Sequence, residues 1–301
     1  MKSFFAKESG SMLVMSAVAM LFVLAATGFV VDGGQLYSTK SHLQKTANAA
    51  ALSGAQEIPN SQAAVEGVVQ EVMAAHNEAG SLQSVNVTST EVHVTVGRPA
   101  PVFFASLFGQ ETIPVEVEAK AAIEPIARAT KAVPLGIDES IPLVYGQDYD
   151  LKVDSGDGEG GHFGILALGG PGAQSYQSSL TYGYQGELAI GDIIQTQTGN
   201  IAGPTRAGIN HRIANCPYPA EGLAERDCSR VMLVIVYVPH EKSNKQLKSI
   251  RITGFAYFYV HDPMGKNDDS IRGTFIRRAG PGEAGEAPAP DKGAYTVRLI
   301  K

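Results

Sequence analysis

Residues Gly10–Val31 read GSMLVMSAVAMLFVLAATGFVV and contain no charged side chain. Lys7 and Glu8 stand before this run, and Asp32 follows it. A helix of this length extends about 33 Å, which is enough to cross a hydrocarbon core of about 30 Å with its backbone amides hydrogen-bonded internally. The sequence therefore predicts a transmembrane helix over residues 10–31.

Two other readings of this run remain open. A cleaved signal peptide also has a basic start, but its apolar region is usually about 7–15 residues long and ends at small residues. Ala25-Ala26-Thr27-Gly28 matches such a cleavage site only loosely. A buried core helix would carry apolar residues on one stripe, whereas this run is apolar all round.

The charges that flank the run decide little about its orientation. Lys2 and Lys7 precede it, while Lys40 and Lys45 follow within fifteen residues, so the positive-inside count is nearly balanced. Long domains cross largely regardless of charge. We therefore expect a single-pass protein of the cell membrane, with residues 1–9 in the cytoplasm and residues 32–301 outside it.

The composition excludes some classes of partner. The chain of 301 residues has a formal net charge of -6, which argues against nucleic acid, because a phosphate backbone demands clustered Lys and Arg. Charged residues make up 18% of the chain, below the roughly 25% typical of soluble domains, and there are 33 glycines and no tryptophan. These features indicate a loop-rich extracytoplasmic protein.

Cys216 and Cys228 are the two cysteines of the chain. Outside the cytoplasm such a pair is most simply a disulfide that closes the loop between them. Free thiols and a metal site are the alternatives, but neither a Cys-x-x-Cys motif nor a nearby histidine pair supports a metal.

Small apolar residues follow the run at helical spacing, at Leu36, Leu43, Ala47, Ala50 and Gly54. One interpretation is an amphipathic helix that lies on its own domain. The other is that small side chains let a helix of another protein approach closely. We predict a partner-facing surface formed by four of these residues, Leu43, Ala47, Ala50 and Gly54.

The same region resembles a known family. Gly10-Ser11 with its apolar helix, Asp32-x-Gly34, and LQKTANAAALSGA over Leu43–Ala55 are similar to the N-terminal module of TadE/TadG-like proteins of Flp (tight adherence) pilus assembly, over residues 9–57. That family usually reads LQxAADAAALAGA, so Thr46 and Asn48 depart from it. The resemblance implies a non-enzymatic component of a pilus assembly or secretion apparatus, with TadE-like proteins and Flp pilin as partners.

The remaining sequence predicts a membrane-anchored α+β protein. A second helix after Asn60-Ser61, a hairpin over residues 85–96 and a strand over 112–124 would form a small pilin-like module over residues 32–128. Residues 129–301 would form a mostly β domain, with strand-like segments at 143–153, 160–172, 182–194, 231–238, 249–260 and 295–300, and one short helix at 173–180. That domain is similar to the region that accompanies the same module in some Gram-positive members.

The densest cluster of carboxylates in the chain comprises Asp148, Asp150, Asp154, Asp157 and Glu159. It is open to three readings: a solvated turn, a calcium loop of a surface adhesin, or the acids of a hydrolase of envelope polymers. Its spacing does not match the D-x-[DN]-x-[DN]-G pattern. No Asp-x-Ser-x-Ser loop or G-x-S-x-G elbow occurs, and Gly169-Gly170-Pro171-Gly172 lacks the ending of a phosphate loop. We therefore predict no enzyme activity, no catalytic, cofactor or metal residue, and no small-molecule substrate.

Overall fold

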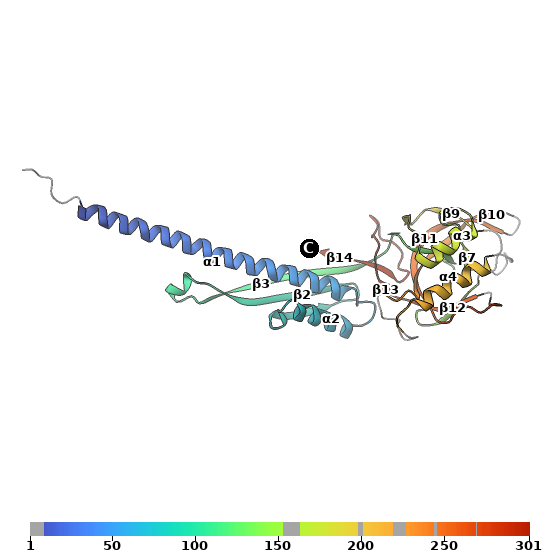
Figure 1. Ribbon diagram of the computed structural model, residues 1–301, viewed down its shortest axis with the longest axis horizontal. Coiled ribbons are helices and arrows are strands. Elements are labelled where there is room, and N and C mark those ends of the chain that lie inside the picture. Colours follow the sequence, from blue (N-terminus) through green and yellow to red (C-terminus); the bar gives the residue numbers. More distant parts are fainter. Residues whose placement is uncertain (1–8, 153–162, 198–200, 219–226, 244–245, 269) are drawn as a thin grey trace, which may run out of the picture. The chain divides into compact units, whose positions relative to one another are not determined.

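One continuous helix, α1 (Ser9–Ala55), carries both the apolar run and the small-residue stripe that follows it. The computed structural model describes residues 9–152, 163–197, 201–218, 227–243, 246–268 and 270–301 (Figure 1). Gly33 and Gly34 do not interrupt the helix, although each costs about 1 kcal/mol relative to alanine. Among the helices that the structure describes, α1 is the one candidate for a membrane span by length and composition.

The chain forms two compact units. The first comprises the chain up to Ala55, then Gln62–Ala122 and Leu299–Lys301. The second comprises Gln56–Ser61 and Ile123–Arg298. The sequence places its domain boundary at residue 128, whereas the two units divide between Ala122 and Ile123, inside a strand.

The first unit packs α1 and α2 (Gln62–Ala75) with an antiparallel sheet. Its strands are β1 (Leu82–Val87), β2 (Glu91–Pro101) and β3 (Thr112–Pro125), with β2 between the other two. The short helix η1 (Ala79–Ser81) precedes β1, and η2 (Ala105–Phe108) lies in the connection from β2 to β3.

Alternation along β2 determines which face of this sheet is covered. Val92, Val94 and Val96 are fully buried, while the residues between them are less so. In α2, Val65, Val69 and Met73 are buried at the spacing of one helical face. The helix and the hairpin predicted from the sequence are therefore present, with their apolar faces turned into one core.

The last residues of β3, Ile123–Pro125, belong to the second unit, which also contains β14 (Ala294–Ile300) up to Arg298. β14 pairs in parallel with β13 (Arg278–Ala279).

The second unit is built around a sheet of order β6-β12-β11-β10-β5-β7. Its strands are β5 (Ala132–Asp138), β6 (Asp148–Lys152), β7 (Phe163–Ile165), β10 (Val231–Ser243), β11 (Gln246–Val260) and β12 (Ser270–Ile276), with β9 (Ile193–Gln195) paired to β11. β4 (Arg128–Ala129) and β8 (Leu188–Ala189) form a separate pair.

Strand β10 is central, and its residues Met232–Tyr237 are buried on both faces. Val234 and Val236 enter one core, which also holds residues of α3 (Ala173–Tyr182) and α4 (Ala202–Ala214). Leu233 and Ile235 enter a second core on the opposite side. A continuous apolar run in the sequence is the pattern expected of such a strand. An apolar N-terminal helix followed by mixed α and β structure confirms the predicted α+β class.

Candidate functional site

The N-terminal half of α1 exposes apolar side chains on all sides. Leu13, Phe22 and Val23 are 70%, 73% and 64% exposed, and the run ends with Phe29, Val30 and Val31, which are also exposed. Contiguous apolar surface of this extent is not tolerated in water and marks a membrane or protein contact. From Met12 onward, Gly28 is the first buried residue of the helix, and from Asp32 a buried face develops.

Asp32 joins α1 to the connection between β2 and β3. Its carboxylate accepts backbone N–H groups from Phe103 at 2.7 Å, from Phe104 at 3.0 Å and from Ala105 at 2.8 Å. The side chain is buried in this contact, at 8% exposure. Burial raises the pKa of Asp32, but the three backbone donors outweigh it and leave that pKa below its ordinary value. Asp32 therefore holds the connection as a charged acceptor.

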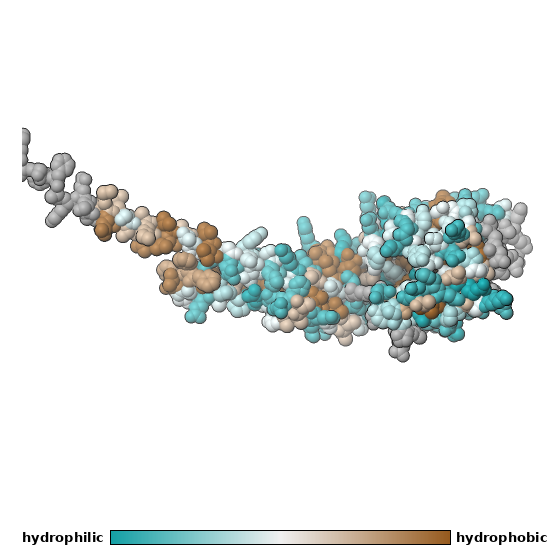
Figure 2. All heavy atoms as spheres, in the orientation of Figure 1, coloured by the Kyte–Doolittle hydropathy of each residue, from teal (hydrophilic) through white to brown (hydrophobic). Residues whose placement is uncertain are grey.

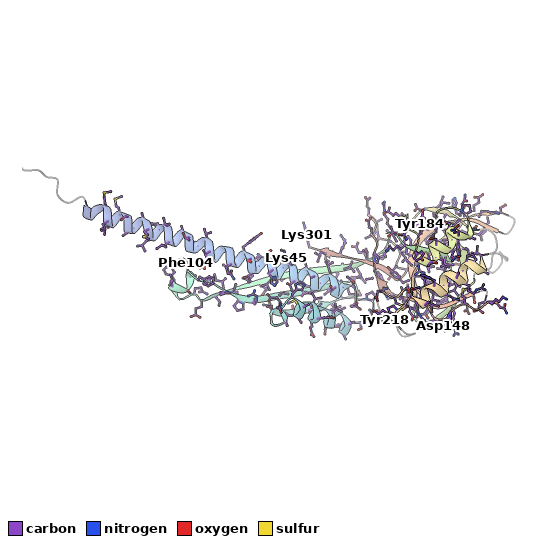
Figure 3. All side chains as sticks on the ribbon, viewed as in Figure 1. Lys45, Phe104, Asp148, Tyr184, Tyr218 and Lys301 are labelled. Atoms are coloured by element: carbon purple, nitrogen blue, oxygen red, sulfur yellow. A yellow bond between two sulfur atoms is a disulfide. The ribbon has the colours of Figure 1, made fainter. Side chains whose placement is uncertain are left out.

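Gly28 makes the second contact, one helical turn before Asp32. A Cβ at residue 28 would overlap the ring of Phe104, so only glycine permits this approach. Figure 3 shows Phe104 at the end of the β2–β3 hairpin, beside α1. Gly28 and Asp32 together fasten the end of the hairpin to the helix.

The same end of the hairpin presents apolar side chains to the outside. We call residues Val102–Gln110 the hairpin tip. Phe103, Leu107 and Phe108 in this tip are 61%, 77% and 89% exposed. Figure 2 shows hydrophobic atoms of this tip next to those of the apolar half of α1, with hydrophilic atoms beyond them.

The four residues predicted to face a partner lie inside the first unit. Leu43, Ala47 and Ala50 are fully buried, and Gly54 is buried so closely against α2 that a Cβ would lie 2.7 Å from Val69 Cγ2. Small residues do allow close helix approach here, but the neighbour is α2 of the same chain. A partner could reach this stripe only if α2 and β2 moved away from it.

The disulfide joins Cys216 to Cys228, as the sequence predicts. Cys216 lies just beyond the end of α4 and Cys228 just before β10, and both pack with Tyr259. The described residues contain no free cysteine. The bond therefore ties the last helix of this unit to its central strand.

Arg212 supports the same junction from inside the protein. Its guanidinium donates to the carbonyl oxygens of Leu180 and Ser229, the latter at 3.0 Å. Burial lowers the pKa of Arg212 to about 10, so the group stays charged at neutral pH. A cavity of about 640 Å³ is lined by Arg212 together with Lys131, Tyr182 and Cys228. Because the guanidinium is committed to backbone carbonyls, we assign it a structural role.

The carboxylate cluster is only partly described. Asp148 pairs with Arg272 at 3.0 Å and with His261 at 3.2 Å, and it accepts a hydrogen bond from Thr274 at 3.1 Å. The hydrogen bond from Arg272 is the largest cause that lowers the pKa of Asp148. These contacts fix β6 against β12.

Three other carboxylates of the cluster, Asp154, Asp157 and Glu159, lie outside the described residues. Among the residues that are described, no three His, Cys, Asp or Glu side chains are grouped as metal ligands.

Gly169, Gly170 and Gly172 all have positive φ ahead of α3, so this segment is the glycine turn that the absence of a phosphate-loop ending indicates.

Sequence reasoning missed the contact between α1 and the hairpin tip. Asp32 and Phe103 are 71 residues apart, and neither stands in a motif that would pair them. One signal was available: from Pro99 to Gln110 the sequence PAPVFFASLFGQ contains no charge, although it connects two strands that alternate with polar residues. Hairpin connections in water are usually polar.

One known protein family matches the N-terminal module of this chain. Residues 10–57 match the family model described as Putative Flp pilus-assembly TadE/G-like. The N-terminal module is therefore TadE/G-like, which confirms the resemblance seen in the sequence. The match spans the apolar run, Gly28, Asp32 and the buried stripe, and ends just beyond α1. No curated protein and no solved structure matches the chain.

Proposed function

We propose that this protein is a non-enzymatic, single-pass membrane component of a Flp/Tad-type pilus assembly or secretion apparatus, which binds other envelope proteins such as TadE-like proteins and Flp pilin. The observation that carries the proposal is the change along α1. Its residues up to Val31 expose apolar side chains, apart from the side covered at Gly28. Its residues from Asp32 pack into a folded unit, and both parts lie within the TadE/G-like match.

The disulfide supports an extracytoplasmic position for residues 32–301. Disulfide bonds persist in oxidising compartments and are rare in the cytoplasm. Cys216 and Cys228 are both buried, and the second unit contains no second crosslink among its described residues. The disulfide would therefore form outside the cytoplasm, on the side of the membrane to which the second unit is exported.

In this proposal, residues 32–301 bind the other proteins of the apparatus. The family match supports pilus components as partners, and the buried stripe of α1 supports a rigid attachment of the first unit to its helix. Of the carboxylates on which a hydrolase or a calcium-dependent adhesin would depend, Asp148 is engaged by Arg272, His261 and Thr274.

The anchor and the topology are tested together. Membranes of cells that make the full chain are washed with alkaline carbonate and then treated with protease from the outside. We expect the intact mass to stay in the washed membrane, and the protease to remove residues beyond Asp32. A soluble chain that begins near residue 29 would mean signal cleavage and would overturn the single-pass reading.

The role in assembly is tested in the same cells. Deletion of the gene should abolish surface pili, and the full chain should restore them and co-purify with a TadE-like protein or Flp pilin after crosslinking. Normal pili in the deletion strain would remove the pilus assignment without affecting the anchor.

A further inference from the structure

The hairpin tip, Val102–Gln110, is fastened beside the place where α1 changes from apolar to polar. Gly28 lies in the last turn of the apolar run, and Asp32 is the first charged residue after it. These two residues are about 6 Å apart along the helix axis, and both contact the tip. The tip therefore lies at the level where α1 would leave the hydrocarbon core.

The exposed apolar side chains of this part of the chain are concentrated at that level. Beyond the apolar run, the described residues of the first unit expose five large apolar side chains: Phe103, Leu107 and Phe108 in the tip, Tyr37 on α1, and Leu299. Phe103, Leu107 and Phe108 lie in a stretch without charge, bounded by Arg98 and Glu111. Aromatic and aliphatic side chains on an uncharged loop are the composition of an interfacial membrane contact.

Most backbone N–H groups of the tip are hydrogen-bonded within the protein, as a poorly hydrated environment requires. Asp32 accepts the N–H groups of Phe103, Phe104 and Ala105. The N–H groups of Val102, Leu107, Gly109 and Gln110 bond to the carbonyl oxygens of Glu111, Phe104, Ser106 and Ala105, respectively. An amide without a partner is costly where water is scarce. Seven of the nine backbone N–H groups of the tip thus have an acceptor, which favours its entry into the bilayer surface.

Phe104 and Phe103 have different surroundings, although they are adjacent. The ring of Phe104 lies on Gly28 and locks the tip to α1. Phe103, Leu107 and Phe108 have no such cover and are exposed. Figure 2 shows hydrophobic atoms of the tip beside those of the exposed half of α1. The lipid that surrounds the exposed half of α1 would also cover the neighbouring apolar side chains of the tip.

We propose that the hairpin tip is a second membrane contact, in which Phe103, Leu107 and Phe108 insert among the lipids of the leaflet from which α1 emerges. This inference rests on the proposed membrane anchor. The first unit would then contact the membrane through both α1 and the hairpin tip. These two contacts would prevent it from tilting freely, and would hold it at a fixed height for assembly with its partners.

The absence of tryptophan from the sequence allows a direct test. The full chain is reconstituted into phosphatidylcholine and phosphatidylglycerol vesicles as three single-tryptophan variants. Phe108→Trp reports the tip, Phe22→Trp reports the middle of the apolar run, and Tyr182→Trp reports an exposed site of the second unit. Their fluorescence is compared in vesicles with acyl chains brominated near the headgroup or near the bilayer centre.

We expect Phe108→Trp to be quenched, and more strongly by the shallow bromines than by the deep ones. Phe22→Trp should be quenched more strongly by the deep bromines, and Tyr182→Trp by neither. If Phe22→Trp is quenched while Phe108→Trp is not, the tip does not touch lipid and the inference fails, although the anchor stands. A blue-shifted but unquenched Phe108→Trp would mean that protein covers the tip, which also overturns it. Loss of quenching at Phe22→Trp would overturn the anchor itself.

Discussion

Gly54 of α1 and Val69 of α2 lie so close that a single added carbon at residue 54 would stand 2.7 Å from Val69 Cγ2. This contact explains why α1 carries small residues in its second half. Ala47, Ala50 and Gly54 form the surface on which α2 and β2 of the same unit lie. The stripe is thus a core contact in this structure.

Ala50→Leu should destabilise the first unit. Ala50 is fully buried, and overpacking a core position by three carbons costs about 1–3 kcal/mol. We expect a lower midpoint of thermal unfolding for the purified full chain in detergent, with Ala74→Leu, at an exposed position of α2, as the matched control. A stable Ala50→Leu variant that fails to assemble pili would instead place a partner on the stripe.

Thr46→Val should stabilise the first unit. Thr46 is fully buried, and its Oγ1 has no hydrogen-bond partner among the described residues. The TadE/TadG-like family usually has alanine at this point of the motif. Because Val has the same shape as Thr, the change removes an unsatisfied hydroxyl without a cavity, and should add about 1 kcal/mol.

The control for that prediction is Thr112→Val, at an exposed residue of β3, which should change stability by less than about 0.5 kcal/mol. Both are measured by chemical unfolding. A loss of stability in Thr46→Val would show that the hydroxyl is bonded in the native protein.

Cys216→Ser should lower the stability of the second unit. The disulfide closes a loop with a sequence separation of 12, which the chain-entropy estimate values at roughly 3 kcal/mol. The exported protein should unfold at a lower temperature when reduced, while Cys216→Ser should unfold at that lower temperature with or without reductant. Thiol labelling of both cysteines in the native exported protein would refute the bond.

Local patterns predicted the two parts of α1, from the uncharged run and from the small-residue stripe that follows it. They also predicted α2 and the β1–β2 hairpin, because the apolar residues of each recur with a clear period. Helix α4 was missed, since its buried face contains Thr205, Gly208 and Arg212 in addition to Ile209. Such a face has no apolar stripe to detect. Arg212 is buried because backbone carbonyls accept its donors, and that contact comes from a segment 32 residues away.

The small-residue stripe shows a different limit of sequence reasoning. Its composition predicted a close helix neighbour, which the structure contains, but composition does not identify whether that neighbour belongs to the same chain. The hairpin tip shows a third limit. Its uncharged sequence is informative only once Asp32 and Gly28 are known to hold it at the end of the apolar run.

Val23→Arg should impair membrane insertion. Val23 lies near the centre of the apolar run, where an arginine costs about 2.5–3.5 kcal/mol on the translocon scale. We expect less protein in carbonate-washed membranes and fewer pili, whereas Val23→Leu should behave as the unaltered protein. Unchanged insertion of Val23→Arg would mean that this helix meets the membrane in another way.

Asp32→Ala should release the hairpin tip from α1 while the rest of the first unit stays folded. The change leaves the N–H groups of Phe103, Phe104 and Ala105 without their charged acceptor. Amide hydrogen exchange at these residues should then be faster by on the order of tenfold or more, because hydrogen bonds to charged groups are the stronger ones.

Asp32→Asn separates charge from shape in the same experiment. Its amide oxygen can still accept, so exchange at Phe103–Ala105 should fall between that of the unaltered protein and that of Asp32→Ala. Glu116→Gln, at an exposed residue of β3, is the control and should leave exchange at the tip unchanged. Because the pKa of Asp32 lies below its ordinary value of 3.8, the carboxylate should hold the tip at any pH above that value. Release of the tip should occur only as the pH falls through the lower pKa that Asp32 has in the folded protein. If the amides of Phe103–Ala105 had already lost their protection from hydrogen exchange near pH 6, the proposed role of Asp32 would be wrong.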